Sequence, residues 1–141
     1  MPAKYVLRYV PKDQILDLWP TIGPLLNRPS ERTPGLRNAN DILDDALDGF
    51  ALLWVVHPES EPGRIVMAME TKELQTSVGP ICELISLGGD GMPDWFDTIL
   101  EQLETMAKDA GMARIRAVGR PGWKRLMADY RTVGVMLEKR L

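Results

Sequence analysis

The sequence predicts a single α/β domain of the α+β kind, in which helices cover a mixed, mostly antiparallel sheet. One observation is the length of 141 residues, which is typical of one domain and sufficient for a core without disulfides or metals. A second is a change of hydrophobic period, from two helical patterns to three apolar runs of strand length. A third is a strand–helix–strand pattern near the end, which implies a parallel pair. We therefore expect residues 1–141 to form one domain.

The predicted elements follow one another without a repeat or a long linker, in the order β-α-α-β-β-β-α-β-α-β. From their apolar runs and the turns that bound them, the expected strands are residues 5–10, 50–57, 64–71, 81–87, 114–118 and 133–137. From apolar residues at helical spacing, the expected helices are residues 15–26, 42–47, 95–110 and 123–130. The three middle strands should form an antiparallel set.

Local signals refine the first two helices. Pro20 and Pro24 should kink or divide the first one, because proline lacks the N–H that a helix interior needs. Residues 27–37 are polar and rich in proline, which predicts a surface loop. Asn40 or Asp41 can then cap the second helix.

The charges are unevenly spread along a chain whose net charge is only −3. Residues 40–110 carry fifteen acidic and three basic groups, whereas residues 112–141 carry eight basic and two acidic ones. This asymmetry suggests an anionic ligand near the C-terminal third, a head-to-tail contact with a partner, or simply a solvated basic face. No nucleic-acid motif accompanies the basic residues, so nucleic-acid binding is not expected.

Other features bound the location and the chemistry. The longest apolar run, 50–56, is far too short to cross a bilayer, and the start lacks the apolar region of a secretory signal. The single cysteine, Cys82, excludes an internal disulfide and fits a reducing compartment, so we expect a cytoplasmic protein without membrane contact. Cys82 and the single histidine, His57, leave no usable zinc cluster, and no metal is expected.

The element order and two segments resemble the acyl-coenzyme A N-acetyltransferase (GNAT) superfamily. Leu103 to Gly111 resembles the end of the third helix of those enzymes, and Arg125 to Val135 resembles their Tyr-x-x-x-Gly-Phe segment, with Val135 replacing the aromatic residue. The resemblance covers nearly the whole chain and implies a GNAT fold with a shortened C-terminus. Gly119 to Trp123 is also similar to small GNAT-like proteins of tailed bacteriophages.

The resemblance implies a site for acetyl-CoA. Its pantetheine arm would lie between the fourth and fifth strands, and its pyrophosphate would sit at the start of the following helix. In this sequence Asp90 and Asp94 place negative charge in the phosphate loop, and Pro93 removes a donor, so the cofactor site is weak or degenerate. The residues that would bind the cofactor are Leu84, Ile85, Ser86, Leu87, Gly88, Gly89 and Gly91.

The same resemblance implies an acid and a base. Glu83, on the expected fourth strand, would take a proton from the acceptor amine, and Tyr130 would return one to the departing thiolate. Glu83 could instead be a salt-bridged strand residue facing Arg114 or Arg116, and Tyr130 could be a core tyrosine. Glu70 is a weaker alternative base.

Two functions from different classes follow. One is an acyl-CoA-dependent N-acetyltransferase that acts on a small amine or a protein amino group. The other is a non-catalytic structural or interaction protein of GNAT fold, such as a phage or prophage virion component, which associates with itself or with a virion protein. After Gly134 the chain has room for one strand, whereas the family normally ends in two. The acceptor side of the site is therefore expected to be open or to be completed by a second copy.

Overall fold

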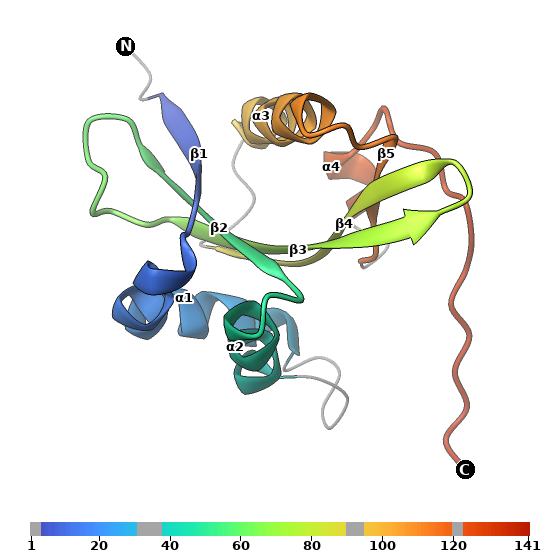
Figure 1. The fold of residues 1–141 in the computed structure, drawn as a ribbon, viewed down its shortest axis with the longest axis horizontal. Helices are drawn as coiled ribbons and strands as arrows, with labels where there is room; N and C mark the ends of the chain where they lie inside the picture. Colours follow the sequence, from blue (N-terminus) through green and yellow to red (C-terminus); the bar gives the residue numbers. More distant parts are fainter. Residues whose placement is uncertain (1–3, 31–37, 90–94, 120–122) are drawn as a thin grey trace.

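The computed structural model describes residues 4–30, 38–89, 95–119 and 123–141. They form one five-stranded sheet in the order β1-β2-β3-β4-β5, with helices on both faces (Figure 1). The strands are β1 Tyr5–Tyr9, β2 Leu52–Pro58, β3 Met67–Thr76, β4 Gly79–Gly89 and β5 Arg114–Ala117. A 3-10 turn at Lys12–Gln14 precedes α1 Ile15–Ser30, and the other helices are α2 Ala39–Leu47, α3 Phe96–Asp109 and α4 Trp123–Leu126.

The first four strands pair antiparallel with their neighbours, whereas β5 pairs parallel with β4. The parallel pair follows from the crossover helix α3, which returns the chain to the same end of the sheet. The mixed, mostly antiparallel sheet that the sequence predicts is thus confirmed.

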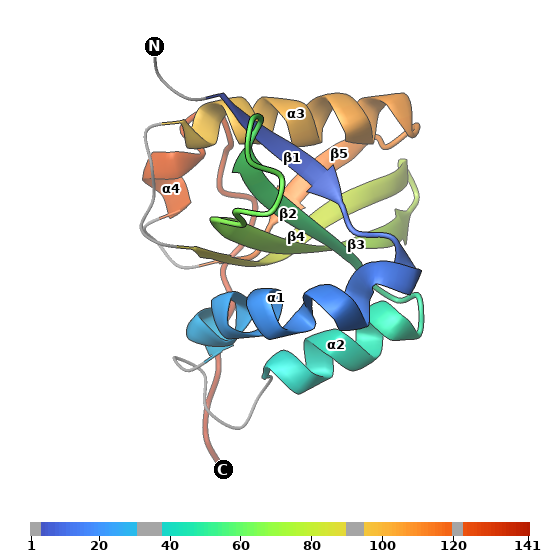
Figure 2. The same cartoon turned by 90° about the vertical axis from the view of Figure 1, so that its left-hand side faces the viewer.

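The sheet separates two hydrophobic cores, because successive side chains of a strand point to opposite faces. Figures 1 and 2 show α1 and α2 on one face and α3 with α4 on the other. The α1/α2 core contains Leu53, Val55 and Ala68, and the α3 core contains Trp54 and Met69. Within the described residues, no helix combines the length and hydropathy that crossing a lipid bilayer requires.

Helix α1 is one continuous helix, so the predicted division at Pro20 and Pro24 is wrong, and residues 27–30 belong to the helix rather than to a loop. Both prolines are exposed, so the carbonyl groups that they leave unpaired can bond to water. The opposite side of the helix buries Ile22 and Leu26 completely. We infer that this burial outweighs the cost of the two missing hydrogen bonds.

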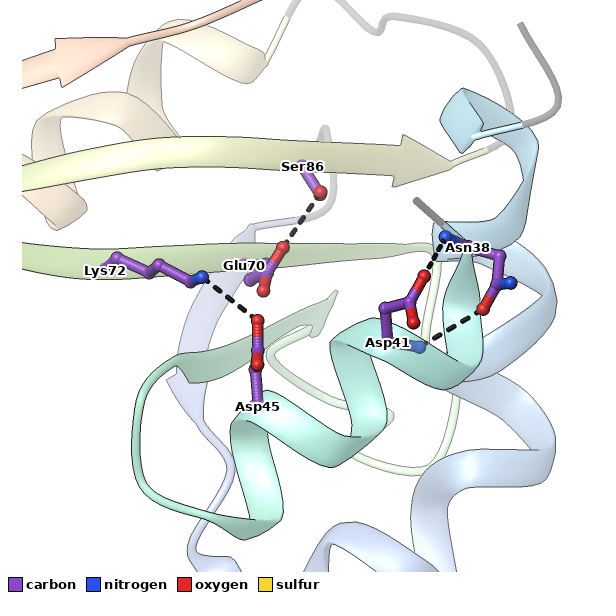
Figure 3. A network of polar contacts seen from close by, with 6 residues as sticks. All are labelled: Asn38, Asp41, Asp45, Glu70, Lys72 and Ser86. Carbon is purple, nitrogen blue, oxygen red and sulfur yellow. Dashed lines mark hydrogen bonds and ion pairs between the residues drawn. The ribbon is translucent and has the colours of Figure 1, made fainter. Parts of the chain in front are cut away.

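Helix α2 begins at Ala39, three residues before the predicted start at residue 42. Its cap is Asn38, whose side chain accepts hydrogen bonds from the backbone N–H groups of Asn40 and Asp41. The Asp41 carboxylate accepts in return from the Asn38 N–H at 2.8 Å, which completes a capping box (Figure 3). The helix ends before Gly49, whose φ of 82° favours glycine.

The expected strand at residues 133–137 is absent from the structure. Residues 131–141 have no regular secondary structure, and all of them are exposed. A β-prone run forms a strand only when a neighbouring strand supplies hydrogen bonds and packing, and this run has neither in the described part of the chain.

Candidate functional site

Strands β4 and β5 separate halfway along β4. They pair over Ile81–Leu84 and Arg114–Ala117, and the last bond joins the Val118 N–H to the Leu84 carbonyl at 3.1 Å. Beyond it, the second half of β4 still pairs with β3 on one side. On the other side, residues 85–88 have no strand partner among the described residues. The result is a stretch of strand edge without a strand partner in the described part of the chain, and we call this divergence of β4 and β5 the opening.

A β-bulge marks the place where the two strands part. The pairing of β3 with β4 shifts between Glu70 and Thr71, which face Ser86 and Leu84, so Ile85 has no residue opposite it. A bulge reverses the alternation of side chains that follow it. As a result Ser86 faces α1 and α2, while Leu87 joins the α3 core.

Glu83 lies on β4 immediately before the opening. Arg116, its register partner on β5, donates from Nε to Glu83 Oε2 at 2.9 Å, and its Nη2 bonds to the same oxygen. The second oxygen, Oε1, has no hydrogen bond to any described residue. The side chain of Glu83 is 19% exposed, so it is accessible from the α1/α2 side. The salt-bridged interpretation thus describes its contact correctly, with Arg116 rather than Arg114, and its role in catalysis stays a prediction.

Two further polar pairs lie beside Glu83 on the same face. Lys72, which is opposite Glu83 in the register, donates to Asp45 of α2 at 3.0 Å. Glu70 is fully buried, and its Oε1 accepts from the Ser86 hydroxyl at 3.0 Å. Figure 3 shows the Lys72–Asp45 pair between the sheet and α2, and the Glu70–Ser86 pair between β3 and β4. The α1/α2 face of the sheet is therefore polar just before the opening, where Asp45, Lys72, Glu83 and Arg116 carry alternating charges.

Tyr130 lies on the other face of the sheet. It packs against the α3 core and lines an open hollow of about 390 Å³ between the C-terminal half of α3 and the start of β5. Its hydroxyl lies near the carboxylate of Glu104 on α3. Burial raises the pKa of Tyr130 above its usual range, and the charge and hydrogen bond of Glu104, then Cys82 and Asp129, raise it further. The tyrosine therefore keeps its proton at neutral pH.

The structure does not bring Glu83 and Tyr130 together. Cys82, whose charge would act on Tyr130, precedes Glu83 on β4 and points to the opposite face. The base and the acid that the sequence suggests thus lie on opposite faces of the sheet.

The raised pKa of Tyr130 predicts a loss of stability at alkaline pH. The unfolded chain releases the phenolic proton near pH 10, whereas the folded chain retains it. Above pH 10 the unfolded state then binds fewer protons than the folded state, so the free energy of unfolding falls as the pH rises. The slope of this fall corresponds to about one proton per molecule at most. Chemical denaturation from pH 9 to 11 should show a smaller loss for Tyr130→Phe than for wild type. The exposed-tyrosine variant Tyr9→Phe is the control, and equal losses in all three proteins would contradict the assignment.

The expected cofactor residues lie partly in the opening. Leu84 to Gly89 all belong to β4, but Gly91, Asp90 and Asp94 lie outside the described residues. Gly88 packs against α1 so closely that a Cβ atom would come within 1.9 Å of the Leu25 carbonyl oxygen. The missing side chain of Gly88 is therefore explained by the contact with α1.

Sequence reasoning missed several members of this site. The sequence shows Glu104 only as a polar residue of the expected helix 95–110, and no pattern indicates that it lies near Tyr130. Lys72, Asp45 and the Ser86 side chain gain importance only from the strand register. Charged residues in the middle of otherwise apolar strands were the available signal, because such residues need a partner or an opening to solvent.

Comparison with known proteins identifies the fold. Neither the protein-family models nor the curated proteins contain a match. Among solved structures, the ribosomal-protein-alanine N-acetyltransferase from Brucella melitensis biovar Abortus 2308 is 11% identical, with a TM-score of 0.69 over 98% of this chain and 99% of its own. The aminoglycoside N-acetyltransferase AAC(6')-Iy in complex with CoA is 11% identical, with a TM-score of 0.65 over 99% and 97%. A predicted acetyltransferase with acetyl-CoA from Clostridium acetobutylicum is 13% identical, with a TM-score of 0.61 over 97% and 96%.

At these identities the likeness concerns the fold. The described chain has the architecture of acetyltransferases over nearly its full length, so the predicted GNAT fold is confirmed.

Proposed function

We propose that this chain, which has the fold of the GNAT acetyltransferases, binds acetyl-CoA in the opening between β4 and β5 and transfers the acetyl group to an amine. The observation that carries the proposal is the unpaired edge of β4 at residues 85–88, at the point where β5 turns away. Solved structures of similar fold are in complex with CoA or acetyl-CoA, which supports the choice of cofactor.

The strand edge has the chemistry that a pantetheine arm needs. Backbone N–H and C=O groups alternate along it, and the two amides of pantetheine can bond to such an edge as a further strand would. The bound acetyl-CoA would supply an activated acetyl thioester. The chain's own backbone from Ile85 to Gly88 would hold and orient it, and the bulge at Ile85 would set the depth at which it lies.

Glu83 is the residue that we propose as the base. Arg116 binds only Oε2, so Oε1 is available to accept a proton from an amine on the α1/α2 side. The ion pair also restricts rotation of the carboxylate beside the opening. A carboxylate held in one orientation is better placed to accept the proton.

Tyr130 is the residue that we propose as the proton donor. Burial and the nearby carboxylate of Glu104 raise its pKa, so the hydroxyl is protonated at neutral pH. From the α3 face of the sheet, the protonated hydroxyl of Tyr130 can donate its proton to a leaving thiolate on the same side. Glu83 and Tyr130 would then act from opposite faces on a thioester that passes between the strands.

A thermal-shift titration tests the proposal. At a hundred times its dissociation constant, acetyl-CoA should stabilise the folded chain by about 2.7 kcal/mol, which raises the melting temperature by several degrees. S-acetylpantetheine should also produce a shift, because the proposed contact is the strand edge and not the phosphate loop. ATP at the same concentration is the control for an effect of anions alone.

The outcomes separate the two functions. If neither acetyl-CoA nor S-acetylpantetheine shifts the melting temperature, the acetyltransferase proposal is wrong and the non-catalytic interaction protein becomes the better account. If ATP shifts it as far as acetyl-CoA does, the chain binds anions without the proposed strand-edge site.

A further inference from the structure

Strand β1 forms one edge of the sheet, and α3 lies beside it (Figures 1 and 2). The N–H of Val10, just after β1, bonds to the carbonyl of Leu53 on β2. Because the backbone groups of successive strand residues point to opposite sides, the even-numbered residues of β1 turn theirs toward β2. Tyr5, Leu7 and Tyr9 therefore turn their N–H and C=O groups outward. An edge of this kind is a template on which another strand can pair.

The side chain of Gln102, on α3, occupies the middle of this edge. Its Oε1 accepts from the Leu7 N–H at 2.9 Å, and its Nε2 donates to the Tyr5 carbonyl at 3.1 Å. One residue of a parallel strand would bond to the same two groups, because its N–H and C=O reach two residues that are two positions apart on the neighbouring strand. The amide of Gln102 thus takes the place of one residue of a sixth strand.

Contacts other than these two hydrogen bonds hold α3 in position. Trp95, immediately before the helix, stacks on the ring of Tyr5 with the ring centroids 4.0 Å apart. Ile99 and Leu103 of α3 are buried in the core on this face of the sheet. Shortening Gln102 should therefore remove its contact with the edge and leave the helix in place.

The edge without Gln102 would offer a row of backbone groups that need partners. Leu7 is only 2% exposed, so its N–H would lose its bond in a place with little access to water, and an unpaired buried N–H is destabilising. Farther along the edge, the carbonyl of Leu7 and both backbone groups of Tyr9 have no hydrogen-bond partner among the described residues. An added strand would satisfy all of these groups together.

Strand β1 of a second copy matches this row. In an antiparallel pair centred on Leu7, that residue faces its own counterpart, and Tyr5 faces Tyr9 of the second copy. Arg8 then faces Val6 of the second copy, so no like charges are directly opposed. Cross-strand aromatic pairs stabilise antiparallel sheets, and the arrangement has the two-fold symmetry that a dimer of identical chains favours.

We propose that the β1 edge is a latent strand-binding surface, and that Gln102 closes it and keeps two copies of this chain from pairing there. The partner that fits the edge once Gln102 is shortened is β1 of a second copy. The inference is independent of the proposed binding of acetyl-CoA, because it rests on contacts between α3 and β1 alone.

Hydrogen exchange of the Leu7 N–H, followed by NMR at several protein concentrations, tests the closure. In Gln102→Ala at low concentration, this N–H should exchange at least about tenfold faster than in wild type, because its bond is lost. At high concentration it should be protected again, because a second β1 takes up the bond. Wild type should show no such dependence on concentration. Gln75→Ala is the matched control, because it removes an exposed side-chain amide that bonds to Glu73.

Sedimentation velocity measures the association itself. Gln102→Ala should dimerise with a dissociation constant at least about tenfold below that of wild type. Gln102→Ser, which is also too short to reach the edge, should behave in the same way. Adding Tyr9→Pro should reverse the effect, because proline removes an outward N–H that β2 does not use and is tolerated in edge strands.

Three results would overturn the proposal. The first is association of both Gln102 variants that is no stronger than that of wild type and of Gln75→Ala. The second is an equal exchange rate of the Leu7 N–H in wild type and in Gln102→Ala. The third is a Gln102→Ala dimer that persists when Tyr9→Pro is added, since such a dimer would not pair through β1.

Discussion

Replacing Gly88 by alanine is expected to destabilise the protein by about 3 kcal/mol, which lowers the melting temperature by about 10 °C. The added Cβ would lie 1.9 Å from the carbonyl oxygen of Leu25 and 2.7 Å from its carbonyl carbon. These are backbone atoms of α1, so no side-chain rotation can relieve the overlap. Either the helix or the strand must move, and the move would disturb the fully buried Leu26 next to the contact.

Gly63→Ala is the matched control, because nothing lies within 4 Å of the Cβ position there. It should leave the melting temperature within about 2 °C of wild type, as surface substitutions usually do. The two variants are compared by thermal unfolding followed by circular dichroism. If Gly88→Ala melts at the temperature of the Gly63 variant, the close contact between α1 and β4 is not present in solution.

The sequence predicted most of this fold because its hydrophobic periods are unambiguous. Strand runs alternate or are wholly apolar, and helix α3 shows a clear stripe, which leaves few arrangements for a chain of this length. The errors arose where tertiary contacts outweigh local preference. Helix α1 continues through Pro20 and Pro24 because its other side is buried, and residues 133–137 form no strand because a strand needs a partner.

The site was less predictable than the fold, for a physical reason. Glu83 could be identified as an unusual strand residue, but its choice of Arg116 over Arg114 depends on the register between β4 and β5. The two residues that this register brings together are 33 positions apart in the sequence, and no local pattern encodes their pairing. Gly88 is a second example. In the sequence this glycine suggests close approach of a ligand, whereas in the structure it allows close approach of α1.

Replacing Glu83 by glutamine should lower turnover of acetyl-CoA by about 10² to 10³-fold, within the range that a general base contributes. Glutamine keeps the shape of the side chain and can still accept a hydrogen bond from Arg116, but it cannot take a proton from the amine. The affinity for acetyl-CoA should change less than about twofold, because the proposed contacts of the cofactor are with the backbone of residues 85–88. Steady-state kinetics and a binding titration measure the two quantities separately.

A loss of stability would not explain such a result. The ion pair is partly exposed, with side-chain accessibilities of 19% for Glu83 and 42% for Arg116, and pairs of this kind contribute about 0 to 1 kcal/mol. Glu61→Gln changes a more exposed ion pair with Arg64, at 3.3 Å in the connection between β2 and β3, and it should leave turnover unchanged. Arg116→Met leaves the carboxylate in place without its anchor, so it should lower turnover by less than Glu83→Gln does. If Glu83→Gln and Glu61→Gln are equally active, then Glu83 is a structural ion-pair residue, and the amine must lose its proton to water or to another group on the α1/α2 side.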